Sequence, residues 1–140
     1  MLYIDTSVLV AYYCPESISQ KAEKIIINAD APVISPLTEV EFASALARKT
    51  REGMLSLESS NRILNEFKSH IHQLLFKKIL IDTDCYNLAF NWLSGKNIPL
   101  ATLDSLHLAA ASLNNLKMVT ADKQLSTAAR KLGIECQLVG

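Results

Sequence analysis

The sequence predicts an α/β fold with a mostly parallel central sheet. Short runs that read as buried strands, too brief to form helices, recur at residues 2–4, 33–34, 77–81, 117–120 and 134–139. Between these runs lie longer stretches in which apolar side chains repeat at helical spacing. Strands that alternate with helices favour parallel pairing and right-handed crossovers.

The first strand, at residues 2–4, is closed by the acid Asp5. Apolar character resumes at Val8 and continues to residue 13, which predicts a helix that Thr6 or Ser7 caps. Pro15 ends this helix. A second helix is expected over residues 17–29, where isoleucine and alanine recur on one stripe.

The second strand, at residues 33–34, stops at Ser35-Pro36, a pair that typically begins a helix. The following helix is expected over residues 36–52 and ends at Gly53. Another helix is expected over residues 56–76. The short connection at residues 53–55 predicts that these two helices form an αα-hairpin.

The remaining elements continue the alternation. A strand at 77–81 precedes a helix at 82–93, which Asp82 or Thr83 caps. A helix rich in small residues follows Asp104 over residues 105–115. A strand at 117–120, a helix at 122–132 that ends at Gly133, and a last strand at 134–139 complete the chain.

Composition is that of a soluble globular protein, and 140 residues predict one domain spanning 1–140. Fourteen basic and fourteen acidic side chains balance, which argues against nucleic-acid binding through bulk charge. No stretch has the length of a membrane helix, and the N-terminus lacks a basic region typical of a signal peptide. Three scattered cysteines without metal-type spacing indicate reduced thiols and a cytoplasmic protein.

Four acids are expected to meet at the carboxyl edge of the sheet. Asp5 follows the first strand, Asp122 follows the strand at 117–120, and Asp104 lies at the start of a helix. Glu41 lies four residues from both Leu37 and Ala45 and so shares their apolar face. In an open α/β sheet this edge is where the binding crevice lies. Asp5 taken alone favours an ordinary cap or turn residue, and the recurrence of the pattern later in the chain is what favours a functional acid.

Clustered carboxylates repel one another, so such a group either has raised pKa values or binds a cation. An all-oxygen ligand set without paired cysteines or histidines suits Mg²⁺ or Mn²⁺. A metal of this kind lowers the pKa of a bound water and stabilises a leaving oxygen. The chemistry predicted from the acids is therefore metal-assisted hydrolysis of a phosphodiester.

Four segments together resemble the PIN-domain ribonucleases, and most closely the VapC-type toxins of bacterial toxin–antitoxin pairs. These segments are MLYIDTSVL, ISPLTEVEFASAL, LATLDSLHLAAA and MVTADKQL, in the family order. The resemblance covers nearly the whole chain. It implies a three-layer PIN-like fold in which helices and an αα-hairpin flank the sheet. It also implies an endoribonuclease that cuts RNA with Mg²⁺ or Mn²⁺.

Carried over by motif, the resemblance implies that Asp5, Glu41 and Asp104 are the principal metal-site acids, with Asp122 the fourth. Ser7 and Thr120 match hydroxyl positions that flank the site. The same resemblance implies a type II toxin that a cognate antitoxin blocks, and a homodimer. If the family motif were aligned two residues earlier, Glu39 would take the place of Glu41 as the metal-site acid. Glu39 lies on another face of the helix, which favours Glu41.

Two alternatives stay open at this point. His107 lies three residues after Asp104 on the same helical face, where it is either an ordinary packed histidine or a support for the acids. The chain is either a nuclease or a PIN-like module that binds a protein or RNA without catalysis. Four intact acids favour the nuclease, because a site without a metal gains nothing from their repulsion.

Overall fold

The sheet of this protein is fully parallel, as a computed structural model describing all 140 residues shows. Five strands are arranged in the order β3-β2-β1-β4-β5. Every neighbouring pair is parallel, which confirms the predicted fold class. The strands are β1 (Leu2–Ile4), β2 (Val33–Ile34), β3 (Lys77–Lys78), β4 (Lys117–Thr120) and β5 (Cys136–Leu138).

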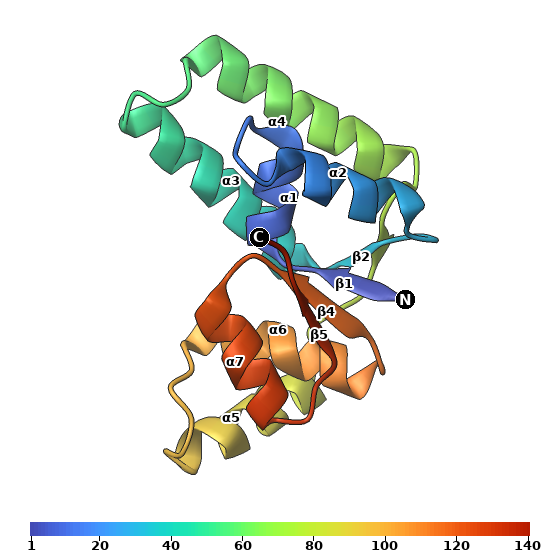
Figure 1. The fold of residues 1–140 in the computed structure, drawn as a ribbon, viewed down its shortest axis with the longest axis vertical. Helices are drawn as coiled ribbons and strands as arrows, with labels where there is room; N and C mark the ends of the chain where they lie inside the picture. The colour runs from blue at the N-terminus through green and yellow to red at the C-terminus, as the bar shows by residue number, and fades with distance from the viewer.

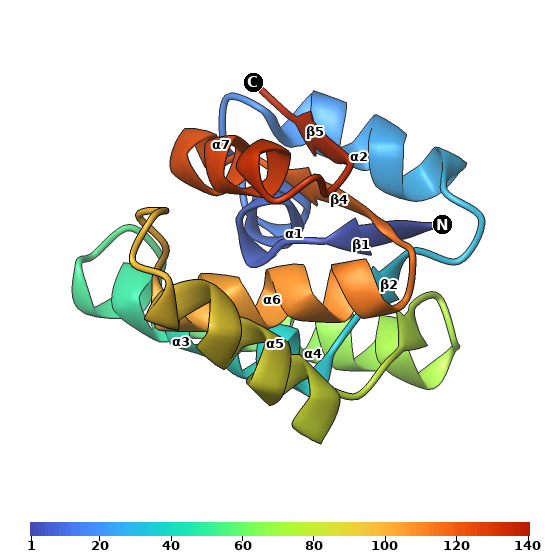
Figure 2. The same ribbon diagram turned by 90° about the horizontal axis from the view of Figure 1, so that it is seen from below.

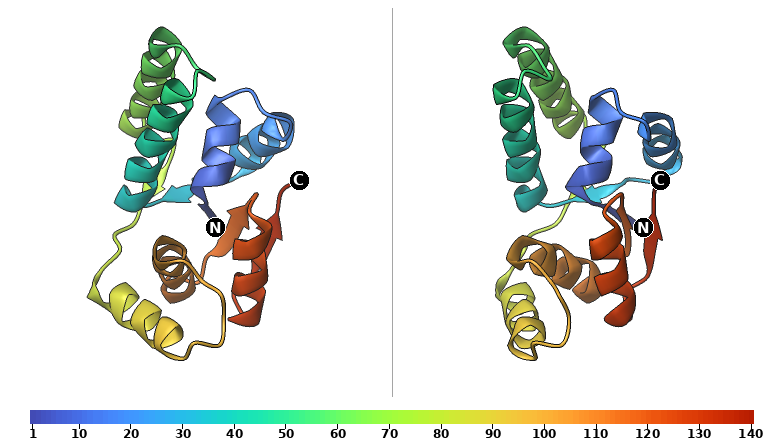
Figure 3. Two further views of the ribbon diagram at one scale, coloured as in Figure 1. Left: turned by 90° about the vertical axis from the view of Figure 1, so that its left-hand side faces the viewer. Right: turned by 60° about the vertical axis from the view of Figure 1, so that its left-hand side comes forward.

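Seven helices cover both faces of the sheet and produce three layers. In Figure 1 the first four helices lie above the sheet and the last three lie below it, and Figure 3 shows the same layers from the side. Helix α6 lies against the sheet, and α5 packs on α6 (Figure 2). The helices are α1 (Thr6–Tyr13), α2 (Ser19–Asn28), α3 (Pro36–Arg51), α4 (Leu57–His72), α5 (Thr83–Ser94), α6 (Thr102–Leu113) and α7 (Lys123–Lys131).

Alternation along the central strands divides the buried side chains into two cores. Ile4 and its neighbour Val119 face the layer of α1 to α4. Tyr3 and Met118, the preceding residues, face the layer of α5 to α7. Because successive strand residues point to opposite faces, a short strand with both faces apolar must be covered on both sides. The central strands β1 and β4 are accordingly buried along most of their length.

The predicted αα-hairpin of α3 and α4 packs through aromatic rings. Phe42 of α3 and Phe67 of α4 have ring centroids 4.4 Å apart. Tyr13 at the end of α1 packs edge-on against both rings, and its hydroxyl lies 2.6 Å from His70 Nδ1. The hairpin is thereby attached to the helix that follows β1.

Several predicted boundaries were wrong. Helix α4 ends at His72, not at residue 76, because Leu74 adopts a left-handed conformation with φ of 60°. Leu75 N then donates a hydrogen bond to His70 O. Glycine usually occupies the left-handed position in this helix ending, and no glycine marks it here. Strand β3 covers two residues instead of 77–81, and α6 begins at Thr102, before Asp104.

None of the helices combines the length and the continuous apolar character that crossing a bilayer requires.

Candidate active site

The strand order creates a crevice at the carboxyl ends of β1 and β4. The chain proceeds from β1 outward to β2 and β3 on one side, and later to β4 and β5 on the other. The point where strand order reverses in this way is where open α/β sheets bind ligands. Asp5 directly follows β1, and Asp122 lies two residues beyond β4. Both acids therefore stand at the expected position.

Asp5 is nearly buried and acts as the N-cap of α1, a position that the sequence assigned to Thr6 or Ser7. Its extended backbone and its contact with Ser7 N, at 3.4 Å from Oδ2, are those of a capping residue. The predicted caps were wrong because Thr6 and Ser7 already belong to the helix, and the last residue with extended backbone is Asp5. The acid serves both elements: it ends β1 and begins α1.

The hydroxyls of Ser7 and Thr120 hold the Asp5 carboxylate. Asp5 Oδ2 accepts hydrogen bonds from Ser7 Oγ at 2.5 Å and from Thr120 Oγ1 at 2.8 Å. The same two hydroxyls accept from the backbone beyond β4: Ala121 N donates to Ser7, and Asp122 N donates to Thr120, each at 3.0 Å. The ends of β1 and β4 are thus joined by one hydrogen-bond network around a single carboxylate oxygen.

Glu41, in the second turn of α3, is anchored in a similar way. Its Oε1 accepts from Thr6 Oγ1 at 2.8 Å and lies 2.5 Å from His107 Nε2. Burial raises the pKa of Glu41, but the hydrogen bond and charge of His107, with the hydrogen bond of Thr6, bring it below its ordinary value. Glu41 is therefore held as a carboxylate.

Glu39 lies on a different face of α3 and has a different partner. Its Oε1 forms an ion pair of 2.8 Å with Lys78 Nζ on β3. The helical face predicted for Glu41, toward the other acids, is the one that the structure shows.

Asp104 is the acid whose pKa responds to the other acids of the cluster. Burial raises its pKa to about 6, and the negative charges of Asp5, Asp122 and Glu41 act in the same direction, opposed only by His107. The negative charges of the other three predicted acids therefore act on Asp104. No hydrogen bond to the Asp104 carboxylate is present.

Asp122 is exposed and caps α7, its Oδ1 accepting from the backbone N–H groups of Gln124 and Leu125 at 2.8 and 3.3 Å. Asp5, Glu41 and Asp122 thus share one arrangement, in which the fold anchors one oxygen and leaves the other without a protein partner. Every buried polar side-chain atom has a partner, so the free oxygens of Asp5 and Glu41 reach solvent. Asp104 offers both of its oxygens.

The donor set suits a hard divalent cation that keeps much of its water. No three histidine, cysteine, aspartate or glutamate side chains stand close enough together to enclose an ion. Mg²⁺ is commonly held by one or two carboxylates, water and substrate phosphate instead of a complete protein cage. Free carboxylate oxygens and a raised Asp104 pKa fit such an ion, because a cation would relieve the repulsion.

Two contributions were missed from sequence. Thr6 was considered only as a cap, yet its hydroxyl binds Glu41. Tyr3 was assigned only to an apolar strand, yet its hydroxyl lies 2.7 Å from His107 Nδ1 and 2.8 Å from Ser35 Oγ. A tyrosine in a fully buried strand needs a partner for its hydroxyl, and this was the available signal.

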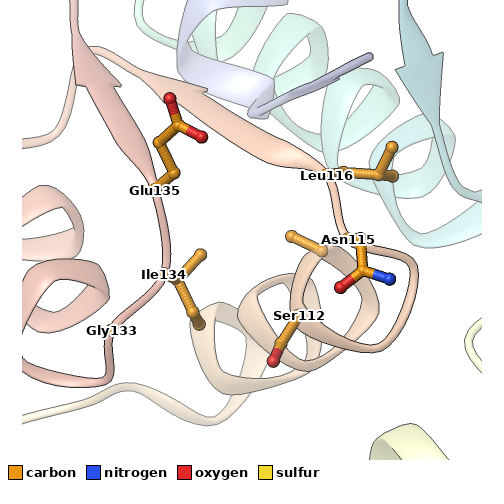
Figure 4. A pocket seen from close by; sticks show the side chains of 7 residues that line it. Ser112, Asn115, Leu116, Gly133, Ile134 and Glu135 are labelled. Carbon is orange, nitrogen blue, oxygen red and sulfur yellow. The ribbon is translucent and has the colours of Figure 1, made fainter.

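A pocket of about 330 Å³ lies away from the acids (Figure 4). It is bounded by the end of α6 and by the segments that lead into β4 and β5, at the amino ends of the strands. Its only ionisable lining residue is Glu135. The four candidate acids lie instead at the opposite edge of the sheet, at the carboxyl ends of the strands.

Known proteins resemble this chain in sequence and in fold. Ribonuclease VapC3 from Pyrobaculum aerophilum is 25% identical over 125 residues, covering 89% of this chain and 92% of that protein. Among solved structures, FitAcB from Neisseria gonorrhoeae superposes with a TM-score of 0.77 at 17% identity, covering 97% of this chain and 96% of that one. VapC20 from Mycobacterium tuberculosis, a toxin that cleaves the sarcin-ricin loop, gives 0.70 at 15% identity, covering 91% and 95%. The PIN domain family matches residues 2–131, and the chain belongs to that family.

Proposed function

We propose that this chain is a metal-dependent endoribonuclease, the toxin of a type II toxin–antitoxin pair. The observation that carries the proposal is the set of acids at the β1–β4 crevice. Three of them are anchored through one oxygen and keep the other free. The fourth, Asp104, has a pKa that burial raises first and the neighbouring acids raise further. Carboxylates that stay close together without a positive partner repel one another. Their presence at the crevice therefore favours a site that binds a cation over a purely structural role.

A bound Mg²⁺ or Mn²⁺ ion would lower the pKa of a coordinated water and stabilise charge developing on the phosphodiester. The residues would supply the geometry. Asp5 and Glu41 present fixed carboxylate oxygens because Ser7, Thr120, Thr6 and His107 hold their partner oxygens. Asp104 and Asp122 add negative charge at the same edge, where they would orient water and the cation.

Relatives support the reaction class. Ribonuclease VapC3 is a ribonuclease by name, and VapC20 is described as a toxin that cleaves the sarcin-ricin loop. This supports RNA as the substrate, despite a net charge of zero. Work on cellular RNA would place the protein in the cytoplasm, where its three free thiols stay reduced.

Relatives also support an antitoxin as partner. Similar structures include VapBC2 from Rickettsia felis bound to a promoter fragment, at a TM-score of 0.70 and 17% identity over the full length of both chains. A cognate antitoxin is therefore the expected protein partner of this chain. The homodimer implied by the family resemblance stays a prediction, and size-exclusion chromatography with light scattering tests it.

The decisive experiment is cleavage of a panel of structured RNAs by the purified chain with Mg²⁺, with Mn²⁺ and with EDTA. Asp5→Asn, which removes a charge while keeping the shape of the side chain, is assayed beside it. Discrete cuts that require metal and vanish in Asp5→Asn would establish the nuclease.

Thermal stability in the same buffers separates the alternatives. If divalent ions neither stabilise the chain nor support cleavage, the protein is a binding module and the proposal fails. If they stabilise it without cleavage, the cation site stands and the RNA panel is widened.

A further inference from the structure

The side chain of His107 is completely buried in α6, yet both of its ring nitrogens have polar partners. Nδ1 lies 2.7 Å from the Tyr3 hydroxyl, and Nε2 lies 2.5 Å from Glu41 Oε1. Because the Glu41 carboxylate only accepts hydrogen bonds, Nε2 carries a proton and donates it. The ring is thus fixed at both ends, and this contact pattern exceeds what packing requires.

Tyr3 is itself held in place by the start of α3. Its hydroxyl donates to Ser35 Oγ at 2.8 Å, and Thr38 Oγ1 lies 3.5 Å away. Ser35 is the N-cap of α3 and forms a capping box with Thr38. Burial raises the pKa of Tyr3 to about 12, so the hydroxyl stays protonated and neutral at physiological pH.

The contacts form a continuous chain from β1, through α6, to α3. Tyr3 fixes the ring of His107, and His107 fixes one oxygen of Glu41, with Thr6 as a second anchor on the same oxygen. A glutamate has three rotatable side-chain bonds, so without these anchors its carboxylate would sample several positions. With them, Oε2 is directed to solvent at the crevice.

We propose that His107, fixed by Tyr3, is a positioning residue that sets the orientation of the Glu41 carboxylate for binding a divalent cation. The proposal rests on the function proposed for the acid site and assigns a specific task within it. Some residues do not bind the metal but hydrogen-bond to a side chain that does. Removing such a residue commonly lowers metal affinity or activity about 10–100-fold. Tyr3 acts one contact further away, so its removal should have a smaller effect.

Three variants separate positioning from packing. His107→Leu keeps apolar volume but removes both nitrogens. His107→Gln places an amide N–H donor near the position of Nε2 and should restore much of the lost function. Tyr3→Phe retains the ring and loses only the hydroxyl. His72→Leu, an identical change at an exposed residue of α4, is the matched control.

Two measurements are made on each full-length variant: Mn²⁺ affinity by calorimetry without RNA, and kcat and KM on a cleaved RNA. We expect His107→Leu to weaken Mn²⁺ binding and lower kcat by about tenfold or more, with KM changed less than about twofold. His107→Gln should recover most of the loss, Tyr3→Phe should fall between, and His72→Leu should match wild type. A rescue by glutamine is not expected of a merely structural histidine.

Failure of this proposal and failure of the nuclease proposal give different results. A folded His107→Leu with wild-type Mn²⁺ affinity and kcat would overturn the positioning role while the nuclease stands. If the wild type cleaves no RNA, the Mn²⁺ affinities still decide the role of His107. Absence of Mn²⁺ binding by the wild type would overturn both. Should His107→Leu not fold, Tyr3→Phe with unchanged affinity and kcat would overturn the proposal.

Discussion

The Thr120 hydroxyl donates a 2.8 Å hydrogen bond to Asp5 Oδ2, joining two residues that are 115 positions apart. Thr120 is fully buried and also accepts from Asp122 N. One hydroxyl thus connects the acid after β1 with the acid after β4. The positions of the acids therefore depend on the side chains that hydrogen-bond to them.

Replacing Thr120 with valine should destabilise the protein, because Asp5 loses a donor and Asp122 N loses an acceptor. We expect a loss of about 1–3 kcal/mol in the free energy of unfolding, measured by urea denaturation. Thr120→Ser keeps the hydroxyl and should lose less than half as much. A Thr120→Val variant as stable as wild type would contradict this role, because valine keeps the methyl group and lacks only the hydroxyl.

Asp104 should make stability depend on pH. Its folded-state pKa of about 6 exceeds the unfolded value, so the folded state binds more protons between about pH 4 and pH 6. Stability from this group is therefore lost as pH rises through that window. Asp104→Asn should be more stable than wild type at pH 7 by on the order of 1 kcal/mol, after allowance for solvent screening.

The advantage of Asp104→Asn should shrink toward zero at pH 4, where the wild-type carboxyl is protonated in the folded state. Urea unfolding in EDTA at the two pH values provides the test. A difference between variant and wild type that does not change with pH would contradict the electrostatic origin of the shift.

Glu41 and Glu39 offer a paired test on one helix. Glu41→Gln should abolish divalent-dependent stabilisation and RNA cleavage, because it alters a fixed oxygen donor at the crevice. Glu39→Gln removes only a partly exposed ion pair with Lys78 and should change stability by less than about 1 kcal/mol. If Glu39→Gln were the inactive variant, the motif would be shifted by two residues and the assignment of Glu41 would be wrong.

A substitution at Leu74 should stabilise the protein, because this residue adopts φ of 60° and is 81% exposed. Glycine takes this conformation without the steric cost that a Cβ atom brings. Leu74→Gly should therefore raise the free energy of unfolding by about 1 kcal/mol. Leu74→Ala, which loses the same exposed side chain but keeps the Cβ, should show no such gain in chemical denaturation.

Local sequence patterns predicted where the candidate acids lie in the fold. Asp5 and Asp122 were found because each follows an apolar strand, and Glu41 because helical spacing puts it with Leu37 and Ala45. Parallel pairing then brings the strand ends together without further information. The family resemblance added Ser7 and Thr120, and the structure places both hydroxyls on Asp5.

What escaped prediction depends on contacts between distant segments. The bond from Tyr3 to His107 spans 104 positions, and that from His107 to Glu41 spans 66. Neither follows from a pattern within one element. The end of α4 was missed for a different reason: a leucine takes the conformation that glycine normally signals, so composition gave no boundary there.

The central position of β1 has a consequence for synthesis of the protein on the ribosome. Among the strands β1 is made before its neighbour β4, and the Thr120 hydroxyl lies 115 positions after the Asp5 that it binds. Asp122 lies still further along, so a nascent chain that already contains β1 lacks the β4 half of the crevice. The candidate site can therefore form only after β4 has left the ribosome.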